Sequence, residues 1–161
     1  MTTLVPICPE QFSAFAEAAN SGYAQDNVLS GRWPSAEAST LAKAEFEQLL
    51  PQGRATPNHY VYEIEDETAG ETVGFLWFAV VGASDARSAF IYNVTVKQSF
   101  RRRGHAMAAL AWLEQFANAQ GLASIRPNVF AHNPQAQALY RALGYKTTSM
   151  NMRKVMRVNG T

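Results

Sequence analysis

The chain contains only one cysteine, Cys8, among its 161 residues. A single thiol excludes an internal disulfide and any zinc site built from several thiolates. No residue beside Cys8 would activate it as a nucleophile. The histidines and carboxylates also lack the spacing of metal ligands, so we expect no metal site.

Charged residues and long apolar runs are scarce as well. Charged residues make up 17% of the chain and the formal net charge is +1, which argues against a general binder of polyanions such as nucleic acids. The longest apolar run, residues 73–81, is far too short to span a bilayer. Residues 1–10 lack the basic and apolar segments of a secretory signal. We therefore expect a cytoplasmic protein with no nucleic-acid partner and no membrane partner.

Hydrophobic residues, by contrast, make up 47% of the chain, which is enough for a sizeable core. No internal repeat and no linker rich in proline, glycine or serine divides the sequence. We expect one domain spanning residues 1–161.

The hydrophobic periodicity predicts a mixed order of helices and strands. Helices are predicted at residues 9–20, 35–50, 106–120 and from Pro134 to about Gly144. Strands are predicted at residues 4–7, 60–65, 72–81, 89–97, 124–131 and 145–156. Residues 21–33 read as a polar connection between the first two helices. This order indicates an α/β (α+β) domain with one mixed sheet.

The most informative stretch runs from Val94 to Ala106. An apolar strand gives way to three consecutive arginines and Gly104, and an alanine-rich helix follows. The first turn of a helix leaves backbone N–H groups unpaired, and the helix dipole adds partial positive charge there. A glycine permits close approach, and arginines supply forked donors for phosphate oxygens. The stretch indicates a phosphate-binding turn, although a solvated basic loop that opens an ordinary helix would look the same.

Two motifs in this half of the chain carry a family resemblance. The spacing Arg101-x-x-Gly104-x-Ala106 matches the (Gln/Arg)-x-x-Gly-x-(Gly/Ala) signature of the GNAT acetyltransferase superfamily. Residues 133–145 resemble the downstream pattern Asn-x-x-Ala-x-x-Leu-Tyr-x-x-x-Gly-(Phe/Tyr) of the same superfamily. One predicted strand lies between them, as the family requires, and the resemblance extends over residues 89–146.

The resemblance implies a single GNAT-like domain: a mixed sheet, splayed at its centre and flanked by helices, that holds acetyl-CoA between two parallel strands. Pro127 lacks an N–H that such a splay would leave unpaired, although an edge strand or a bulge would also accept it. Tyr140 is implied as the acid that protonates the leaving sulfur, with plain core packing as the alternative. The implied contacts with acetyl-CoA are Val94, Thr95, Val96, Arg101, Arg102, Arg103, Gly104, His105, Ala106, Met107, Asn133, Ala136 and Tyr140.

The activity that the resemblance implies is acetyl transfer from acetyl-CoA to a primary amine of a small molecule or peptide by direct attack. Residues 89–95 contain no glutamate, which some family members use as the general base. A non-catalytic domain that binds or senses acyl-CoA is therefore the alternative function. The sequence does not determine the oligomeric state, and a homodimer is one candidate. The remaining candidate bases are Glu63, Glu65, Asp26, Glu37, His59 and His132, or one acting through water.

The acceptor site is expected in the N-terminal half of the chain. Aromatic and acidic side chains suit a cationic amine, which points to Tyr23, Asp26, Trp33 and Tyr60. For Trp33 taken alone, packing in the core or as a helix staple is the simpler interpretation. The sequence does not identify the acceptor.

Overall fold

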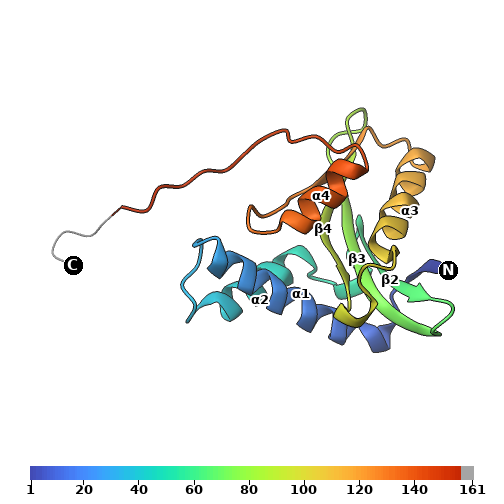
Figure 1. Cartoon of the computed structure of the whole chain (residues 1–161), viewed down its shortest axis with the longest axis horizontal. Coiled ribbons are helices and arrows are strands. Elements are labelled where there is room, and N and C mark those ends of the chain that lie inside the picture. The colour runs from blue at the N-terminus through green and yellow to red at the C-terminus, as the bar shows by residue number, and fades with distance from the viewer. Residues whose placement is uncertain (157–161) are drawn as a thin grey trace.

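The structure is a computed structural model, and it describes residues 1–156. Its centre is a five-stranded sheet in the order β1-β2-β3-β4-β5 (Figure 1). The first three pairings are antiparallel and the pairing of β4 with β5 is parallel, so the mixed α+β sheet is confirmed. The strands are β1 (Thr2–Pro6), β2 (His59–Asp66), β3 (Glu71–Val81), β4 (Ser88–Val96) and β5 (Ser124–Pro127). The helices are α1 (Pro9–Leu29), α2 (Ala38–Leu49), α3 (His105–Ala119) and α4 (Pro134–Ala142), with short 3-10 turns η1 (Gly53–Ala55) and η2 (Gln98–Phe100).

Both faces of the sheet are covered, as expected for a central strand that is apolar on both sides. Phe75 and Trp77 of β3 pack against Phe15 of α1, on the face covered by α1 and α2. Leu76 and Phe78 alternate with them and pack with α3 on the opposite face. Figure 1 shows α3 across the sheet from α1 and α2. None of the helices in residues 1–156 is long and apolar enough to cross a membrane.

Strand β5 pairs with only the first part of β4. β5 pairs with β4 only from Ser88 to Ile91, whose partner is Pro127. Beyond that point β4 continues to Val96 beside β3 alone. The register also shifts there, because Ile91 faces Phe78 and Asn93 faces Trp77, which leaves a bulged residue between them. The expected splay is therefore present, and it starts at the bulge.

Two element boundaries differ from the sequence prediction. Helix α1 continues to Leu29, so the predicted polar connection at residues 21–33 is mostly helix. Its polar second half is accommodated because Asn27 is buried and its side-chain amide donates to the carbonyl of Tyr23. Strand β5 ends at Pro127 rather than at residue 131, because its pairing with β4 stops at Ile91, where β4 is bulged.

The prediction of a strand at residues 145–156 was wrong. These residues form no strand in the structure. They run as an extended arm away from the body of the protein (Figure 1). Met150, Met152, Val155 and Met156 are exposed along the arm. A strand needs a neighbouring strand for its hydrogen bonds, and none lies beside this segment.

Candidate active site

The separated strands leave backbone groups of β4 directed into the gap between β4 and β5. Successive residues of a strand direct their N–H and C=O groups to alternate sides. Lys97 donates from its backbone nitrogen to the carbonyl of Val73 on β3 (2.7 Å). Val96 and Val94 must therefore direct their groups away from β3, while Thr95 turns toward it. In agreement, the carbonyl of Val96 is bonded by the Nε of Arg101 (3.0 Å).

The turn after β4 presents the N-terminus of α3 at the open end of this gap. Gly104 is the N-cap residue and has φ 83°, a left-handed conformation that suits glycine. A Cβ at this position would meet no atom within 4 Å, so the turn is open to solvent. The first intrahelical bond is donated by Ala108 to Gly104 (3.0 Å). The N–H groups of residues 105–107 thus have no acceptor within the helix, which is the arrangement that binds anions.

The three arginines of the turn are all exposed. Arg101 is held by its bond to the end of β4. The guanidinium of Arg103 lies 5.1 Å from the centre of the Phe100 ring. Arg102 adopts a positive φ of 63°, which turns the chain toward the helix. The turn therefore combines three permanent positive charges with free amides.

His105 differs from its neighbours because its side chain is buried. Its Nδ1 lies 2.8 Å from the Oγ1 of Thr2, and its Nε2 lies 3.4 Å from a carboxylate oxygen of Asp66. The backbone N–H groups of Ala69 and Thr68, with a smaller contribution from His105, hold the pKa of Asp66 below its usual range. The ring thus ties α3 to β1 and β2, and only the backbone amide of His105 faces the turn.

The second motif forms helix α4. Asn133 is its N-cap, and its Oδ1 accepts from the backbone nitrogen of Ala136 (3.1 Å). Tyr140 is buried in the hydrophobic cluster that contains Ile91, the last residue of β4 paired with β5. The Tyr140 side chain therefore belongs to the core next to the start of the gap. Burial raises the pKa of Tyr140 well above its usual range, with a further rise from Tyr145, whose ring is 5.1 Å away.

The predicted acceptor residues of α1 and the following turn do come together. The rings of Tyr23 and Trp33 meet edge to face at 5.4 Å. Arg32 donates to the hydroxyl of Tyr23 (2.9 Å) and its guanidinium lies 4.9 Å from the centre of the Trp33 ring. Its other nitrogen pairs with Glu45 of α2 at 2.9 Å. One ring face of Trp33 is thus already covered by a cation of the protein itself.

Asp26 pairs with His132, a contact between α1 and the segment that precedes α4. The Oδ1 of Asp26 and the Nε2 of His132 are 2.8 Å apart, and both side chains are partly exposed. Gln137 donates to the carbonyls of Phe130 and Ala131 and so fixes the segment that carries the histidine. Sequence reasoning named Asp26 and His132 separately, because nothing in their separation along the chain predicts the contact.

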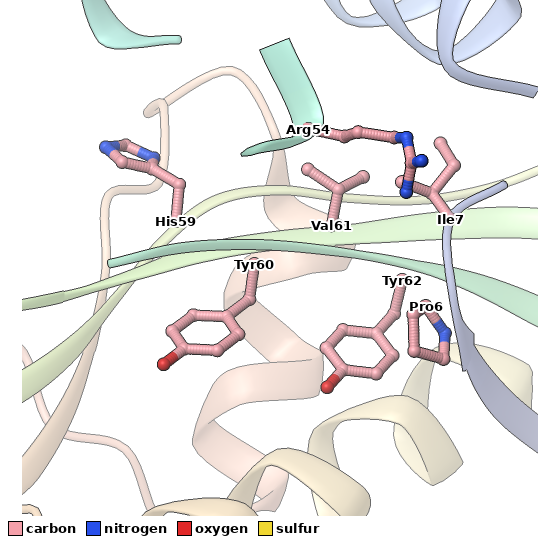
Figure 2. A pocket seen from close by; sticks show the side chains of 7 residues that line it. All are labelled: Pro6, Ile7, Arg54, His59, Tyr60, Val61 and Tyr62. Atoms are coloured by element: carbon pink, nitrogen blue, oxygen red, sulfur yellow. The ribbon is translucent and has the colours of Figure 1, made fainter. Parts of the chain in front are cut away.

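Tyr60 is not part of this group. It stacks on Phe78 with ring centres 5.1 Å apart, on the α3 face of the sheet. Figure 2 shows Tyr60 and Tyr62 on one side of β2 and His59 and Val61 on the other. The pocket that the residues in Figure 2 line, about 130 Å³, lies along β1 and β2, at the opposite edge of the sheet from the gap.

Two other candidate bases are occupied by structural bonds. The Nδ1 of His59 accepts from the indole nitrogen of Trp77 (3.1 Å), and burial lowers the pKa of His59. Glu63 is buried, with one carboxylate oxygen on the backbone nitrogen of Cys8 (3.0 Å) and the other on the hydroxyl of Thr72 (2.8 Å). Both side chains are thus already hydrogen-bonded to groups outside the gap between β4 and β5.

Asn93 was not predicted as a site residue, yet it lies on β4 directly after the bulge. Its Oδ1 is buried and finds no hydrogen-bond partner within residues 1–156. Buried polar atoms are paired in most proteins, so an orphan beside a gap indicates a missing partner. Its carboxamide in a mostly apolar strand was the signal that the sequence offered.

A sheet opened between two parallel strands, with a helix N-terminus at the open end, is the arrangement of acetyl-CoA-dependent acetyltransferases. The sequence profile of the Acetyltransferase (GNAT) family matches residues 25–145. The chain belongs to this family, and it is an N-acetyltransferase. Members of the family use acetyl-CoA as the acetyl donor.

Two proteins of Bacillus subtilis (strain 168) are similar over nearly their whole length. The "Uncharacterized N-acetyltransferase YdgE" is 35% identical over 152 residues, which are 94% of this chain and 96% of YdgE. YycN, named as an uncharacterized N-acetyltransferase too, is 33% identical over 151 residues, with the same coverage of both chains. The crystal structure of YycN superposes with a TM-score of 0.91 and covers 98% of this chain and 100% of that one. The relatives thus establish the reaction class and leave the acceptor open.

Proposed function

We propose that this enzyme transfers the acetyl group of acetyl-CoA to a primary amine of a small molecule or peptide by direct attack. The observation that carries the proposal is the gap beside β4, because it joins a free strand edge to an anion-binding helix N-terminus. The pyrophosphate would lie on the N–H groups of residues 105–107, flanked by the arginines of the turn. Each charge-assisted hydrogen bond contributes about 1.5–3 kcal/mol. A few such bonds suffice for micromolar binding.

The pantetheine arm fits the gap as an added strand would. It is extended and rich in amides, and the backbone groups of Val94 face the position that it would occupy. The buried Oδ1 of Asn93 offers a further acceptor for an N–H beside the bulge. No metal is required by this arrangement. Three separate observations therefore support acetyl-CoA as the ligand: the direction of the Val94 backbone groups, the positive charge of the turn and the unpaired Oδ1 of Asn93.

The reaction would proceed by attack of a neutral amine on the thioester carbon. The C–N bond forms as the carbonyl oxygen takes up charge, and the N–H of Val94 is the candidate donor to that oxyanion. The C–S bond then breaks, and the CoA thiolate takes the hydroxyl proton of Tyr140. The raised pKa keeps the Tyr140 hydroxyl protonated until the C–S bond breaks. It also makes the hydroxyl a weaker acid than a free thiol, so this transfer is uphill and is completed by the loss of the amide nitrogen's proton to a base.

The nitrogen must also lose a proton, and the Asp26–His132 pair is our candidate to accept it. Asp26 binds the Nε2 of His132, which orients the imidazole and leaves Nδ1 for the amine. His59 and Glu63 are engaged elsewhere. Asp26 would then act through His132, and Tyr23 and Trp33 would contact the acceptor with the ring faces that Arg32 leaves uncovered. Tyr60, on the other face of the sheet, takes no part in this pocket.

The alternative is a domain that binds acyl-CoA and transfers nothing, and the lack of a carboxylate in residues 89–95 favours it. Release of CoA thiol from acetyl-CoA should be measured with a panel of alkyl amines, polyamines and lysine-containing peptides. We expect at least one acceptor to raise the release well above the rate of hydrolysis, with an acetylated amine as product. Binding of acetyl-CoA in calorimetry without release for any acceptor class would favour the alternative.

A further inference from the structure

His105 is a buried histidine whose side chain the proposed chemistry does not use. It is the first residue of α3, and its side chain is 5% exposed. Its backbone N–H is one of the three amides at residues 105–107 that have no acceptor within the helix. The ring and this amide belong to one residue, so the contacts of the ring fix the direction in which the amide points.

Two groups on strands β1 and β2 hold the ring. Its Nδ1 lies 2.8 Å from the Oγ1 of Thr2, and its Nε2 lies 3.4 Å from the Oδ2 of Asp66. Asp66 is fixed in turn, because its Oδ1 accepts from the backbone nitrogens of Thr68 (2.9 Å) and Ala69 (3.2 Å). Figure 1 shows the N-terminal strand beside the start of α3. The phosphate turn is thus tied to β1 and β2 through this side chain.

The two contacts suit a protonated ring better than a neutral one. Nε2 is buried and makes no hydrogen bond of normal geometry within residues 1–156. A neutral imidazole donates from one nitrogen, whereas an imidazolium donates from both. The hydroxyl of Thr2 and the carboxylate of Asp66 can each accept such a bond, and the carboxylate adds the attraction of an opposite charge. Since buried polar atoms are usually paired, the unpaired Nε2 beside a carboxylate indicates a site for one further proton.

An anion at the turn would balance the charges around the ring. Asp66 is the acidic group that faces the ring, and the first turn of α3 contains no acidic residue. The positive groups nearby are the amino group of Met1, which acts on Asp66, the arginines at 101–103 and the helix N-terminus itself. Phe100 of η2 contributes an uncharged ring 6.3 Å away. A proton on His105 is therefore opposed by most of these groups, and a pyrophosphate above the same turn would favour it.

We propose that His105 is a positioning residue for the pyrophosphate of acetyl-CoA and that its ring takes up a proton from solvent as the pyrophosphate binds. The protonated ring then donates to Asp66 and Thr2, which holds the amides of residues 105–107 in the direction of the phosphate oxygens. The inference rests on the proposed function, because it needs the pyrophosphate at this turn. Imidazoles change charge between about pH 5 and 8, and the protonated ring binds the anion better. The affinity for acetyl-CoA should therefore fall as the pH rises through this range.

The first test counts protons. Acetyl-CoA is titrated into the protein by calorimetry at about pH 7 in PIPES and in Tris buffer, and the difference in enthalpy gives the number of protons taken up. His105→Gln keeps a donor for Asp66 and cannot be protonated, so wild type should take up about half a proton more than this variant. His59→Gln is the matched control: it changes another histidine that makes a structural bond, and its uptake should equal that of wild type. Equal uptake in wild type and His105→Gln would overturn the proposal.

The second test separates this role from simple support of the helix. The dissociation constant of acetyl-CoA in His105→Gln should be about 10-fold above that of wild type at about pH 5.5 and should approach it at about pH 8.5. At each pH, kcat with saturating acetyl-CoA should stay within a factor of about two, because the ring does not touch the reacting atoms. Circular dichroism checks that each variant is folded. A ratio of dissociation constants that stays constant over this pH range would show that the ring only supports the helix, and would overturn the proposal.

Thr2 gives a second pair of variants in which the histidine is retained. Thr2→Val removes the hydroxyl that accepts from Nδ1 and should lower the proton uptake, whereas Thr2→Ser keeps the hydroxyl and should match wild type. Failure of the wild type to bind acetyl-CoA would overturn the proposed function together with this inference. Identical binding and proton uptake in wild type, His105→Gln and Thr2→Val, with acetyl transfer intact, would overturn the inference alone.

Discussion

At the scale of single residues, side chains of the same type differ in their hydrogen-bond partners and in their surroundings. Tyr140 and Tyr145 lie side by side, and burial raises the pKa of both, that of Tyr145 to about 12. The hydroxyl of Tyr145 is buried without a partner among the described residues, whereas Tyr140 borders the start of the gap. His59 and His132 differ in the same way: the first accepts a structural bond, and the second is held by a carboxylate.

The two tyrosines provide a matched test of proton delivery. Tyr140→Phe should lower kcat by about 10²-fold and leave the affinity for acetyl-CoA nearly unchanged, because only the transition state loses an interaction. Tyr145→Phe removes a buried hydroxyl just after the same helix, one without a partner among the described residues, and should change kcat by less than about 2-fold. Steady-state kinetics and calorimetry measure both effects. Equal turnover of Tyr140→Phe and wild type, with chemistry limiting the rate, would remove Tyr140 from the mechanism.

The Asp26–His132 pair predicts a graded loss. His132→Gln keeps a polar side chain but cannot take a proton, so kcat should fall by about 10²-fold. Asp26→Asn keeps the hydrogen-bond geometry and weakens the orientation of the ring, so a smaller fall, about 10-fold, is expected. The KM for acetyl-CoA should stay within a factor of about two in both variants. Should His132→Gln turn over at the wild-type rate, the proton leaves through water or another base.

At the scale of elements, hydrophobic periodicity correctly predicted the helices and strands whose structure is determined by residues within one motif. The strand, turn and helix from β4 to α3 and the capped helix α4 were all predicted, because local capping and alternation determine them. The length of α1 was not, since the residues that continue it are polar and are satisfied by contacts such as that of Asn27. The arm was mistaken for a paired strand, because alternation indicates a strand without showing which edge receives it.

The same limit applies to the candidate site. The gap and the phosphate turn follow from two motifs, so their residues could be predicted together. The buried His105 ring, the position of Tyr60 on the far face and the contact between Asp26 and His132 depend on which elements pack together. Spacing along the chain carries no information about these contacts.

The turn before α3 gives a test at this scale. Gly104→Glu places a side chain and a negative charge where phosphate would bind, so acetyl-CoA binding should be lost in a folded protein. Gly104→Ala is the control: its Cβ meets nothing within 4 Å, and its cost is the strain of a positive φ, about 1 kcal/mol. Calorimetry with acetyl-CoA separates charge from strain. Unchanged affinity in folded Gly104→Glu would refute the phosphate turn.

Helix α4 gives a second test at the element scale. Asn133→Ala removes the oxygen that caps the nitrogen of Ala136 and should lower the free energy of unfolding by about 1 kcal/mol. Asn133→Asp retains a capping oxygen and should cost much less. Urea titrations measure both. A loss of acetyl-CoA affinity in Asn133→Asp as well as in Asn133→Ala would show that the amide itself contacts the ligand.

At the scale of the whole molecule, the proposed mechanism would divide the reaction between the two halves of the chain. The second half, from β4 to α4, contains the gap, the turn and Tyr140, all proposed to bind and activate acetyl-CoA. The first half brings α1 and its following turn to the segment before α4 through the Asp26–His132 contact. The acceptor would enter where these halves meet, so its identity depends on the half of the chain that carries no motif.

The dependence of the rate on pH tests this division for the enzyme as a whole. An alkyl amine has a pKa near 10.4, so only about one molecule in a thousand is neutral at pH 7. If the neutral amine attacks, kcat/KM should rise about tenfold per pH unit between pH 7 and 9. A weakly basic acceptor, with a pKa below about 6, is the control and should give a flat profile there.

The raised pKa of Tyr140 keeps its hydroxyl protonated over this range, so no fall in kcat/KM is expected at the high end of the range. The same shift limits the measurement at high pH: above about pH 10 tyrosines ionise first in the unfolded chain, and the stability gained by keeping them neutral is lost. A flat profile with an alkyl amine, or a fall in kcat/KM below pH 9 while circular dichroism shows the protein folded, would contradict attack by a free neutral amine with Tyr140 as the acid.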